Sequence, residues 1–278
     1  MKTHLVNIKK TLFHLQGIDV SKYDESFLNK SLHNRIKETK FESAEEYFSM
    51  LEKNKSEGQN FLDSLRNSYT DFFRNPLTFA ILERIILPSM ILKKTESKRK
   101  EIRIWSAACA AGQEAYSLAM LMEEYNDNSN AENISYRIFA TDQCEEQLVK
   151  ARDGKYDLSD LCNLKMKRVK QWFNKHYETY SVVQKLKKNI DFSEFDLFDE
   201  HHSCPPVSIF GDFDVVVCAN LLFYYKLEFR KIILEKTCNS LAKGGYLITG
   251  ETERDILLNY GCHEVYAQSA IFQKRVNH

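Results

Sequence analysis

The chain has 278 residues, and its 43% apolar content is enough for one large α/β domain and a smaller one. Its 39 lysines and arginines balance 39 aspartates and glutamates, so the net charge gives no long-range attraction for a polyanion such as nucleic acid. The seven cysteines form no CxxC pair, and no apolar run approaches the roughly 18 residues of a membrane span, which argues against a disulfide scaffold, a zinc ribbon and membrane insertion. With no apolar signal core after Met1, we expect a cytoplasmic protein.

The first 70 or so residues have the apolar spacing of helices. Leu28, Leu32 and Ile36 recur four apart between charged residues, which predicts a small helical bundle. Ser43 followed by Glu46 fits a capping box, so a helix should begin there and end near Asn54.

After Arg74-Asn75-Pro76, a further helix is predicted to run toward Pro88, followed by a charged linker over residues 93–100. The domain boundary is expected in this region, with a helical domain over residues 1–83 and an α/β domain over residues 84–278.

From Ile102 onward, short apolar runs alternate with helical segments, which is typical of a mostly parallel sheet with crossover helices. Gly244-Gly245 should end the last helix. Residues 180–189 read as a small hairpin or extension, and residues 263–274 as a terminal antiparallel pair. The predicted strands are 102–106, 136–140, 190–195, 213–218 and 246–250, and the predicted helices are 114–125, 143–153 and 227–242.

Small residues, Ala107 to Gly112, follow the first strand and precede a helix. Ligands of open α/β sheets lie at the carboxyl ends of strands near the switch point, so this turn is a candidate cofactor site. Tight packing of a helix on the sheet would explain the same small residues.

Asp142 ends the second strand, where an acidic side chain can accept hydrogen bonds from the hydroxyls of a ribose. Asp142 therefore points to an adenosine-type ligand. Its alternative role is the N-cap of the helix that follows.

Five motifs then occur in the order found in one family. The segment TDFFRNP at residues 70–76 looks like T-x-F-F-R followed by an acidic residue or Asn, and residues 106–117 resemble S-A-A-C-S-x-G-E-E-P-Y-S. Ala140-Thr141-Asp142 matches A-T-D, Gly154-Lys155-Tyr156 matches G-x-Y, and FDVVVCANLLFYY at 213–225 is similar to F-D-x-I-x-C-R-N-V-L-I-Y-F. On these residues the chain resembles the CheR-type protein-glutamate O-methyltransferases, and the resemblance covers nearly the whole chain, including Gly17-Ile18 and residues 27–35.

The resemblance implies a Rossmann-like methyltransferase domain, mostly parallel with a terminal antiparallel strand, preceded by a small all-helical domain. It implies S-adenosylmethionine as cofactor, with S-adenosylhomocysteine as product, and O-methylation of glutamate side chains on a protein. The expected partner is the cytoplasmic region of a chemoreceptor, with no nucleic acid and no membrane insertion, and the chain is expected to be a monomer.

The same resemblance assigns the site. Arg74 would bind the methionine carboxylate of the cofactor, Glu114 would bind its amino group and Asp142 would bind the ribose. Tyr224 would lie beside the sulfonium. Arg74 and Tyr224 are thus the candidate catalytic residues, and no metal is expected. Asp196-Leu197 and Asn220-Leu221 would surround the adenine; the further cofactor contacts would be Thr70, Ala108, Gly112 and Gln143, and the substrate contacts Lys30 and Arg35. Structural alternatives exist: Arg74 could cap a helix end, and Phe223, Tyr224 and Tyr225 could be aromatic packing.

Several positions depart from the family pattern. Gln113, Ala115 and Ala219 replace an acidic residue, a proline and an arginine, and the insert at 172–190, which the family uses as a β-subdomain for receptor tethering, is short. The basic stretch 165–170 could face an acidic partner, although such runs are usually a solvated helix face.

Three other functions compete with this hypothesis. A cofactor-binding signalling module without turnover is compatible with the changes at Ala115 and Ala219. A nucleic-acid methyltransferase is disfavoured because Leu221-Leu222, and not Pro-Pro-aromatic, follows Asn220. A metal enzyme built on His201, His202 and Cys204 lacks an ordered ligand spacing.

Overall fold

The computed structural model describes residues 10–14, 17, 19–65, 69–96, 100–128 and 133–273. The chain divides into two compact units, Met1–Asn67 with Leu222–Lys231, and Ser68–Leu221 with Ile232–His278. Residues 69–83, expected in the helical domain, therefore belong to the larger unit. The reason is packing, because the buried side chains of Phe72, Phe73 and Leu82 are part of that unit's core.

Three helices form most of the described part of the smaller unit: α2 (Glu25–Glu38), α3 (Ala44–Lys53) and α4 (Lys55–Leu65). Ser43 is the N-cap of α3, where its side chain accepts a hydrogen bond from the backbone N of Glu46, and Asn54 is the C-cap. Both ends were predicted from the sequence, because a capping residue satisfies backbone donors that the helix leaves unpaired.

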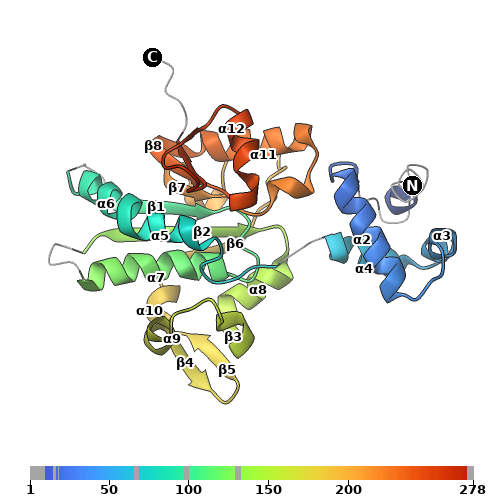
Figure 1. Ribbon diagram of the computed structural model, residues 1–278, viewed down its shortest axis with the longest axis horizontal. Coiled ribbons are helices and arrows are strands. Elements are labelled where there is room, and N and C mark those ends of the chain that lie inside the picture. The colour runs from blue at the N-terminus through green and yellow to red at the C-terminus, as the bar shows by residue number, and fades with distance from the viewer. Residues whose placement is uncertain are drawn as a thin grey trace. The chain divides into compact units, whose positions relative to one another are not determined.

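The described residues of the larger unit form a seven-stranded sheet with the order β6-β2-β1-β7-β8-β10-β9 (Figure 1). β1 pairs in parallel with both β2 and β7, β6 with β2, and β8 with β7, whereas β10 is antiparallel to β8 and β9. The predicted fold class is confirmed, with the antiparallel pair at the end of the chain. The strands are β1 (Glu101–Ser106), β2 (Ser135–Asp142), β6 (Ile190–Glu194), β7 (Phe213–Val217), β8 (Leu241–Ile248), β9 (His263–Glu264) and β10 (Ile271–Gln273).

Helices precede β1 and connect the later strands. They are α5 (Pro76–Ile81), the π-helical turn η1 (Leu82–Ile86), α6 (Leu87–Thr95), α7 (Gln113–Asn128), α8 (Glu145–Asp153), α9 (Met166–Trp172), α10 (Gln184–Lys187), α11 (Leu227–Asn239) and α12 (Arg254–Asn259). Short 3₁₀ turns add η2 (Leu158–Leu161), η3 (Pro206–Ser208), η4 (Leu222–Tyr224) and η5 (Glu251–Glu253). In the part of the chain that the structure describes, no helix is both long and apolar enough to cross a bilayer.

The helix that was expected to run only toward Pro88 continues past it. The backbone N of Leu87 bonds to the carbonyl of Leu82, five residues back, so η1 widens the helix by one residue just before the proline. Because proline lacks an N–H and crowds the preceding turn, this π-helical turn lets α6 continue without an interior break.

The prediction that Gly244 and Gly245 end α11 is wrong. α11 stops at Asn239, and both glycines lie within β8. The pairing of β8 with β7 shifts register between Phe213 and Val215, and a Cβ on Gly245 would lie 2.8 Å from the carbonyl oxygen of Phe213. Gly245 therefore lies at a β-bulge with a close backbone approach, whereas Gly244, with φ +76, has open space where a Cβ would lie.

A second, three-stranded sheet is formed by β3 (Lys155–Asp157), β4 (Phe173–His176) and β5 (Thr179–Val182), in the order β3-β5-β4. It is antiparallel throughout. The expected hairpin at 180–189 is thus displaced toward the N-terminus, and residues 184–187 form α10 instead. Despite its short insert, the chain builds a β-subdomain because the distant segment 155–157 supplies the third strand.

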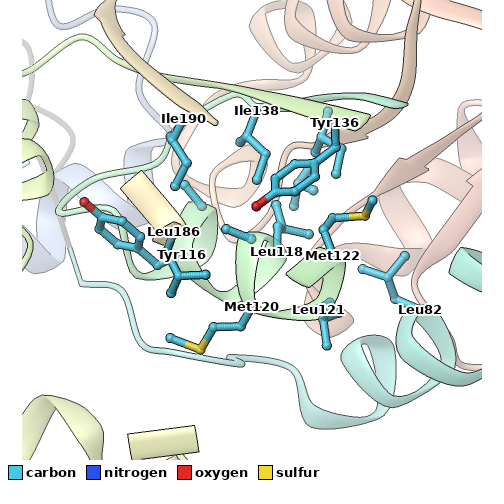
Figure 2. Packing of buried hydrophobic residues seen from close by; sticks show 14 of the residues in the cluster. Leu82, Tyr116, Leu118, Met120, Leu121, Met122, Tyr136, Ile138, Leu186 and Ile190 are labelled. Carbon is cyan, nitrogen blue, oxygen red and sulfur yellow. The ribbon is translucent and has the colours of Figure 1, made fainter. Parts of the chain in front are cut away.

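The main hydrophobic core lies on one face of the large sheet. Alternate residues of β1 and β2, such as Ile104 and Ile138, point into it, together with most of α7. Figure 2 shows Leu118 and Met122 of α7 facing Tyr136 and Ile138 of β2. On the opposite face the ring centroids of Trp105 and Phe213 are 5.5 Å apart. Both faces are covered, as a parallel sheet requires.

Candidate active site

The carboxyl ends of three parallel strands meet at one edge of the large sheet. Ser106, the last residue of β1, is in register with Ala140 of β2 and Val217 of β7. Because the chain leaves β1 toward β2 on one side and later returns to β7 on the other, this edge contains the topological switch point. The loops after β1, β2 and β7 therefore lie side by side.

The small residues after β1 form a tight loop against both neighbours. The backbone N of Ala107 bonds to the carbonyl of Val217 at 2.8 Å, and that of Cys109 bonds to the carbonyl of Thr141 at 2.9 Å. Gly112 has φ +90, and a Cβ there would lie 2.9 Å from Cβ of Ala151 on α8. Close packing thus explains Gly112, whereas Ala108 is partly exposed on the same loop.

Asp142 fixes this loop from the end of β2. Its Oδ2 accepts a hydrogen bond from the backbone N of Ala110 and its Oδ1 one from the backbone N of Cys144, both at 2.9 Å. Cys144 is the N-cap of α8, so Asp142 is not the N-cap that was considered as its alternative role. Gln143 beside it is partly exposed.

Glu114 lies in the first turn of α7 and turns its carboxylate back to β1. The hydroxyl of Ser106 donates a hydrogen bond of 2.6 Å to it. Burial by protein atoms raises the pKa of Glu114 to about 7; the bond from Ser106 and the positive charge of Arg74 oppose this increase, and the negative charge of Glu253 adds to it. A cation bound at this carboxylate would favour its ionised form.

Arg74 lies in a turn of unusual backbone geometry. The residues on both sides, Phe73 with φ +50 and Asn75 with φ +64, are left-handed, a conformation that a phenylalanine rarely adopts. Nη1 of Arg74 donates to the carbonyl of Tyr69 at 2.8 Å, and the guanidinium lies 5.0 Å from the centroid of the Tyr69 ring. Asn75 and not Arg74 is the N-cap of α5, so the helix-capping alternative for Arg74 is wrong.

Asn220, in the loop after β7, is connected to this turn. Nδ2 of Asn75 donates to its Oδ1 at 3.3 Å. Asn220 also has a left-handed backbone, with φ +60, and its N donates to Oε2 of Glu253 at 2.6 Å. A Cβ on Gly250, the N-cap of η5, would lie 2.4 Å from Nδ2 of Asn220, so a larger residue there would displace the Asn220 side chain.

Sequence reasoning missed Glu253. Its side chain is fully buried, and its Oε2 also accepts hydrogen bonds from Oγ1 of Thr249 and the backbone N of Gly250, both at 3.0 Å. The available signal was an acidic residue shortly after the predicted strand 246–250, where it can bind the loop of the neighbouring strand.

The loop after β6 extends the same edge. The backbone N of Phe195 bonds to the carbonyl of Asp142 at 3.1 Å, which places this loop beside the end of β2. Asp196 is exposed and its Oδ1 accepts a hydrogen bond from the backbone N of Phe198, whereas Leu197 is buried. Thr70 and Leu221 are partly exposed residues of the larger unit.

The structure therefore brings Arg74, Glu114, Asp142 and Asn220 to one edge of the sheet, as was expected. Arg74 and Glu114 influence each other electrostatically, Asn220 is bonded to the turn that carries Arg74, and Asp142 is bonded to the loop that leads to Glu114. These contacts join segments that are far apart in the sequence.

Tyr224 belongs to the smaller unit, where it ends η4. Its carbonyl accepts a hydrogen bond of 2.8 Å from the backbone N of Asp24, and its ring centroid lies 4.7 Å from that of Phe27. The ring of Tyr225 stacks on Tyr23 at 5.2 Å. The rings of Tyr224 and Tyr225 are thus packed against Phe27 of α2 and against Tyr23, just before α2.

The two expected substrate contacts on α2 differ from each other. Lys30 is exposed. Arg35 donates from Nε and Nη2 to both carboxylate oxygens of Glu57, at 2.6 and 2.8 Å, and from Nη1 to Glu38 at 3.0 Å. Arg35 therefore joins α2 to α4 in this structure.

No group of three His, Cys, Asp or Glu side chains in the described ranges is arranged to hold a metal ion. Of the suggested metal ligands, His202 lies with Nδ1 2.7 Å from Oδ2 of Asp199.

Comparison with known proteins covers both units. Residues 4–65 match the family model "CheR methyltransferase, all-alpha domain", and residues 68–259 match "CheR methyltransferase, SAM binding domain". A chemotaxis protein methyltransferase of Borreliella burgdorferi is 31% identical over 91% of this chain and 88% of its own length. The proteins of the same name from Listeria monocytogenes and Escherichia coli are 30% and 27% identical, over 86% and 90% of this chain and 85% and 84% of their own lengths.

Proposed function

Since the chain belongs to the CheR methyltransferase family, we propose that it transfers the methyl group of S-adenosylmethionine to glutamate side chains of a chemoreceptor. The match of residues 68–259 to the S-adenosylmethionine-binding domain carries this proposal. The enzyme class and the cofactor follow from the family. The receptor as acceptor is supported by the relatives, which are named chemotaxis protein methyltransferases.

The residues at the carboxyl edge of the sheet fit this cofactor. The carboxylate of Glu114, which has a hydroxyl donor and a raised pKa, suits the ammonium of the methionyl group. The guanidinium of Arg74 can bind the methionyl carboxylate in a bidentate manner, through two parallel hydrogen bonds. The carboxylate of Asp142, at the end of β2, is the type of acceptor that binds the hydroxyls of a ribose.

When bound, S-adenosylmethionine supplies a methyl group activated by a positively charged sulfur. The acceptor glutamate needs no general base, because its carboxyl group, with an ordinary pKa of about 4.3, is ionised at neutral pH. The work of the protein is therefore to align the acceptor oxygen with the methyl group and to exclude water. We assign Arg74 and Glu114 to holding the methionyl end and Tyr224 to orienting the methyl group.

A methyl-transfer assay tests the proposal. The protein is incubated with methyl-labelled S-adenosylmethionine and a receptor cytoplasmic fragment, and the label released by base as methanol is counted. Base-labile label on the receptor is the expected result. Stable label on added RNA, or tight cofactor binding without any transfer, would contradict the proposal.

The role of Tyr224 is tested in the same assay with Tyr224→Phe. Removing the hydroxyl should lower kcat by about tenfold or more while the Kd for the cofactor stays unchanged, because only the transition state loses an interaction. The matched control is Tyr225→Phe, which removes a hydroxyl from the neighbouring buried ring. Equal kcat in wild type and Tyr224→Phe would assign the Tyr224 ring to packing and not to catalysis.

A further inference from the structure

Two phenylalanines immediately precede Arg74, and both are buried. Phe72 is fully buried and Phe73 is 8% exposed. Phe73 holds a left-handed backbone with φ +50. A bulky residue keeps such a conformation only when its surroundings enforce it, so the contacts of these two rings decide where the side chain of Arg74 begins.

The three-stranded sheet holds Phe72. The ring of Phe72 meets Tyr156 of β3 edge to face, with centroids 4.9 Å apart, and meets Phe173 of β4 in the same way at 5.5 Å. The next backbone N, that of Phe73, donates to Oγ of Ser117 on α7 at 3.0 Å. The turn is therefore fixed between the β-subdomain and the helix that carries Glu114.

Arg168 of α9 holds Phe73. Its guanidinium lies over the ring, 4.2 Å from the centroid. The same guanidinium donates from Nη2 to Glu83 of η1 at 3.0 Å and to Glu124 of α7 at 2.7 Å, and from Nε to Glu124 at 2.9 Å. Only 11% of its side chain is exposed, so Arg168 does not lie on a solvated helix face, the usual interpretation of such a basic stretch.

Glu124 and η1 complete the arrangement. Glu124 also accepts a hydrogen bond of 3.0 Å from Nε1 of Trp172, at the end of α9. Glu83 is carried by the π-helical turn that the chain forms before Pro88. Arg168 thus joins α9, α7 and η1 around the ring of Phe73, the residue that precedes Arg74.

We propose that Arg168 is a positioning residue for Arg74, and that through it and Phe72 the β-subdomain is coupled to cofactor binding. This inference rests on the proposed role of Arg74 in holding the methionyl carboxylate. A change in how α9 and the β-subdomain pack changes the turn at Phe73 and with it the direction of the Arg74 side chain. By reciprocity, cofactor binding at Arg74 stabilises the packing of α9.

The first test compares affinities for S-adenosylhomocysteine by calorimetry. Arg168→Gln should weaken binding by about 2- to 30-fold, the range found for residues that modulate a site without contacting its ligand. Arg168→Lys, which keeps the charge but loses the planar fork, should fall between Arg168→Gln and the wild type. An unchanged Kd in Arg168→Gln would overturn the proposal.

The matched control is Lys185→Gln. Lys185 of α10 also joins an insert element to α7, with Nζ 2.9 Å from Glu123 and 2.8 Å from Asp127, and lies 5.5 Å from the ring centroid of Trp172. Within the described ranges, Lys185 contacts Glu123, Asp127 and Trp172 and not Phe72 or Phe73. Its substitution should leave the Kd at the wild-type value; a loss equal to that of Arg168→Gln would make the effect one of general stability and overturn the positioning role.

A double-mutant cycle shows whether Arg168 acts through Arg74. If it does, Arg74→Ala combined with Arg168→Gln should bind S-adenosylhomocysteine no more weakly than Arg74→Ala alone. Fully additive losses would mean that Arg168 supports binding by another route, and the proposal would fail.

Hydrogen exchange of the ligand-free protein separates this inference from the proposed function. In Arg168→Gln the amide of Phe73 should exchange faster than in the wild type, whereas Lys185→Gln should leave it protected. If the wild type binds no S-adenosyl compound, the proposed function fails, but exchange at Phe73 still tests the inference. Unchanged protection of the Phe73 amide in Arg168→Gln refutes it. Faster exchange supports the conclusion that Arg168 fixes the turn that carries Arg74.

Discussion

Each unit of the chain places an arginine near a carboxylate, that of buried Glu57 or that of partly buried Glu114, but the two pairs are built differently. In the smaller unit, Arg35 and Glu57 form a closed pair, with two hydrogen bonds of 2.6 and 2.8 Å and a third from the hydroxyl of Tyr47 to Glu57 at 2.9 Å. In the larger unit, Arg74 and Glu114 form an open pair. Within the described ranges, Arg74 donates one side-chain hydrogen bond, to the carbonyl of Tyr69, and Glu114 accepts one, from Ser106.

The pKa values of the two carboxylates reflect this difference. Burial raises both, but in Glu57 the hydrogen bonds from Arg35, Asn60 and Tyr47 outweigh burial and leave the pKa below its ordinary value. In Glu114 burial dominates and the pKa is about 7. A closed pair has its charges satisfied by the fold, whereas an open pair gains a favourable interaction only when a ligand supplies the missing charges.

The largest expected effect is the loss of stability when the Arg35–Glu57 pair is broken. Arg35→Leu leaves Glu57 buried without its arginine and should lower the free energy of unfolding by about 3–5 kcal/mol in a urea titration. Because the folded-state pKa of Glu57 is lowered, the stability from this pair is present above the ordinary pKa of 4.5 and is lost as the pH falls through the folded-state value, so the two proteins should become more alike in acid.

Lys30→Ala is the matched control, because Lys30 is an exposed residue of the same helix. It should change the free energy of unfolding by no more than about 0.5 kcal/mol. A loss below about 1 kcal/mol in Arg35→Leu would show that the Arg35–Glu57 pair is not what holds α2 to α4.

The next effect concerns the open pair. Arg74→Ala should weaken binding of S-adenosylmethionine by about 1.5–3 kcal/mol, the size of a charged hydrogen bond, with little change in the urea midpoint. Arg74→Lys should recover part of the affinity because it restores the charge without the planar fork. Calorimetry measures both, and wild-type affinity in Arg74→Ala would remove Arg74 from the cofactor site.

The smallest expected effect is a pH dependence. If the cofactor's ammonium requires ionised Glu114, affinity should rise by about eightfold between pH 6 and pH 7.5 as a group with a pKa of about 7 loses its proton. Binding at pH 6.5 should also release a proton, which calorimetry in buffers of different ionisation enthalpy detects.

Glu114→Gln is the control for that titration, and its affinity should be lower and independent of pH over the same range. Because the folded-state pKa of Glu114 is raised, ionising it destabilises the ligand-free protein as the pH rises from 4.5 to about 7, so the variant should be the more stable protein above pH 7. A wild-type affinity that does not vary with pH would show that Glu114 does not meet the ammonium.

Patterns within a short segment predicted the fold well. The apolar runs of β1, β2 and β7 identified a parallel sheet, and Ser43 with Asn54 marked both ends of α3. Predictions failed where a distant partner decided the outcome. Gly245 lies in a bulge because β7 approaches it, and Lys155–Asp157 is a strand because β5 pairs with it.

From the sequence alone, the alternation of apolar runs with helical segments indicated a parallel sheet with polar residues after its strands. The order of the motifs showed which family the chain resembles. This was possible because strand ends and caps depend on neighbouring residues. Only the tertiary structure decided which of its charged side chains are already neutralised, Arg35 by Glu57 and Arg168 by Glu83 and Glu124, because the partners come from segments 22 to 85 residues away.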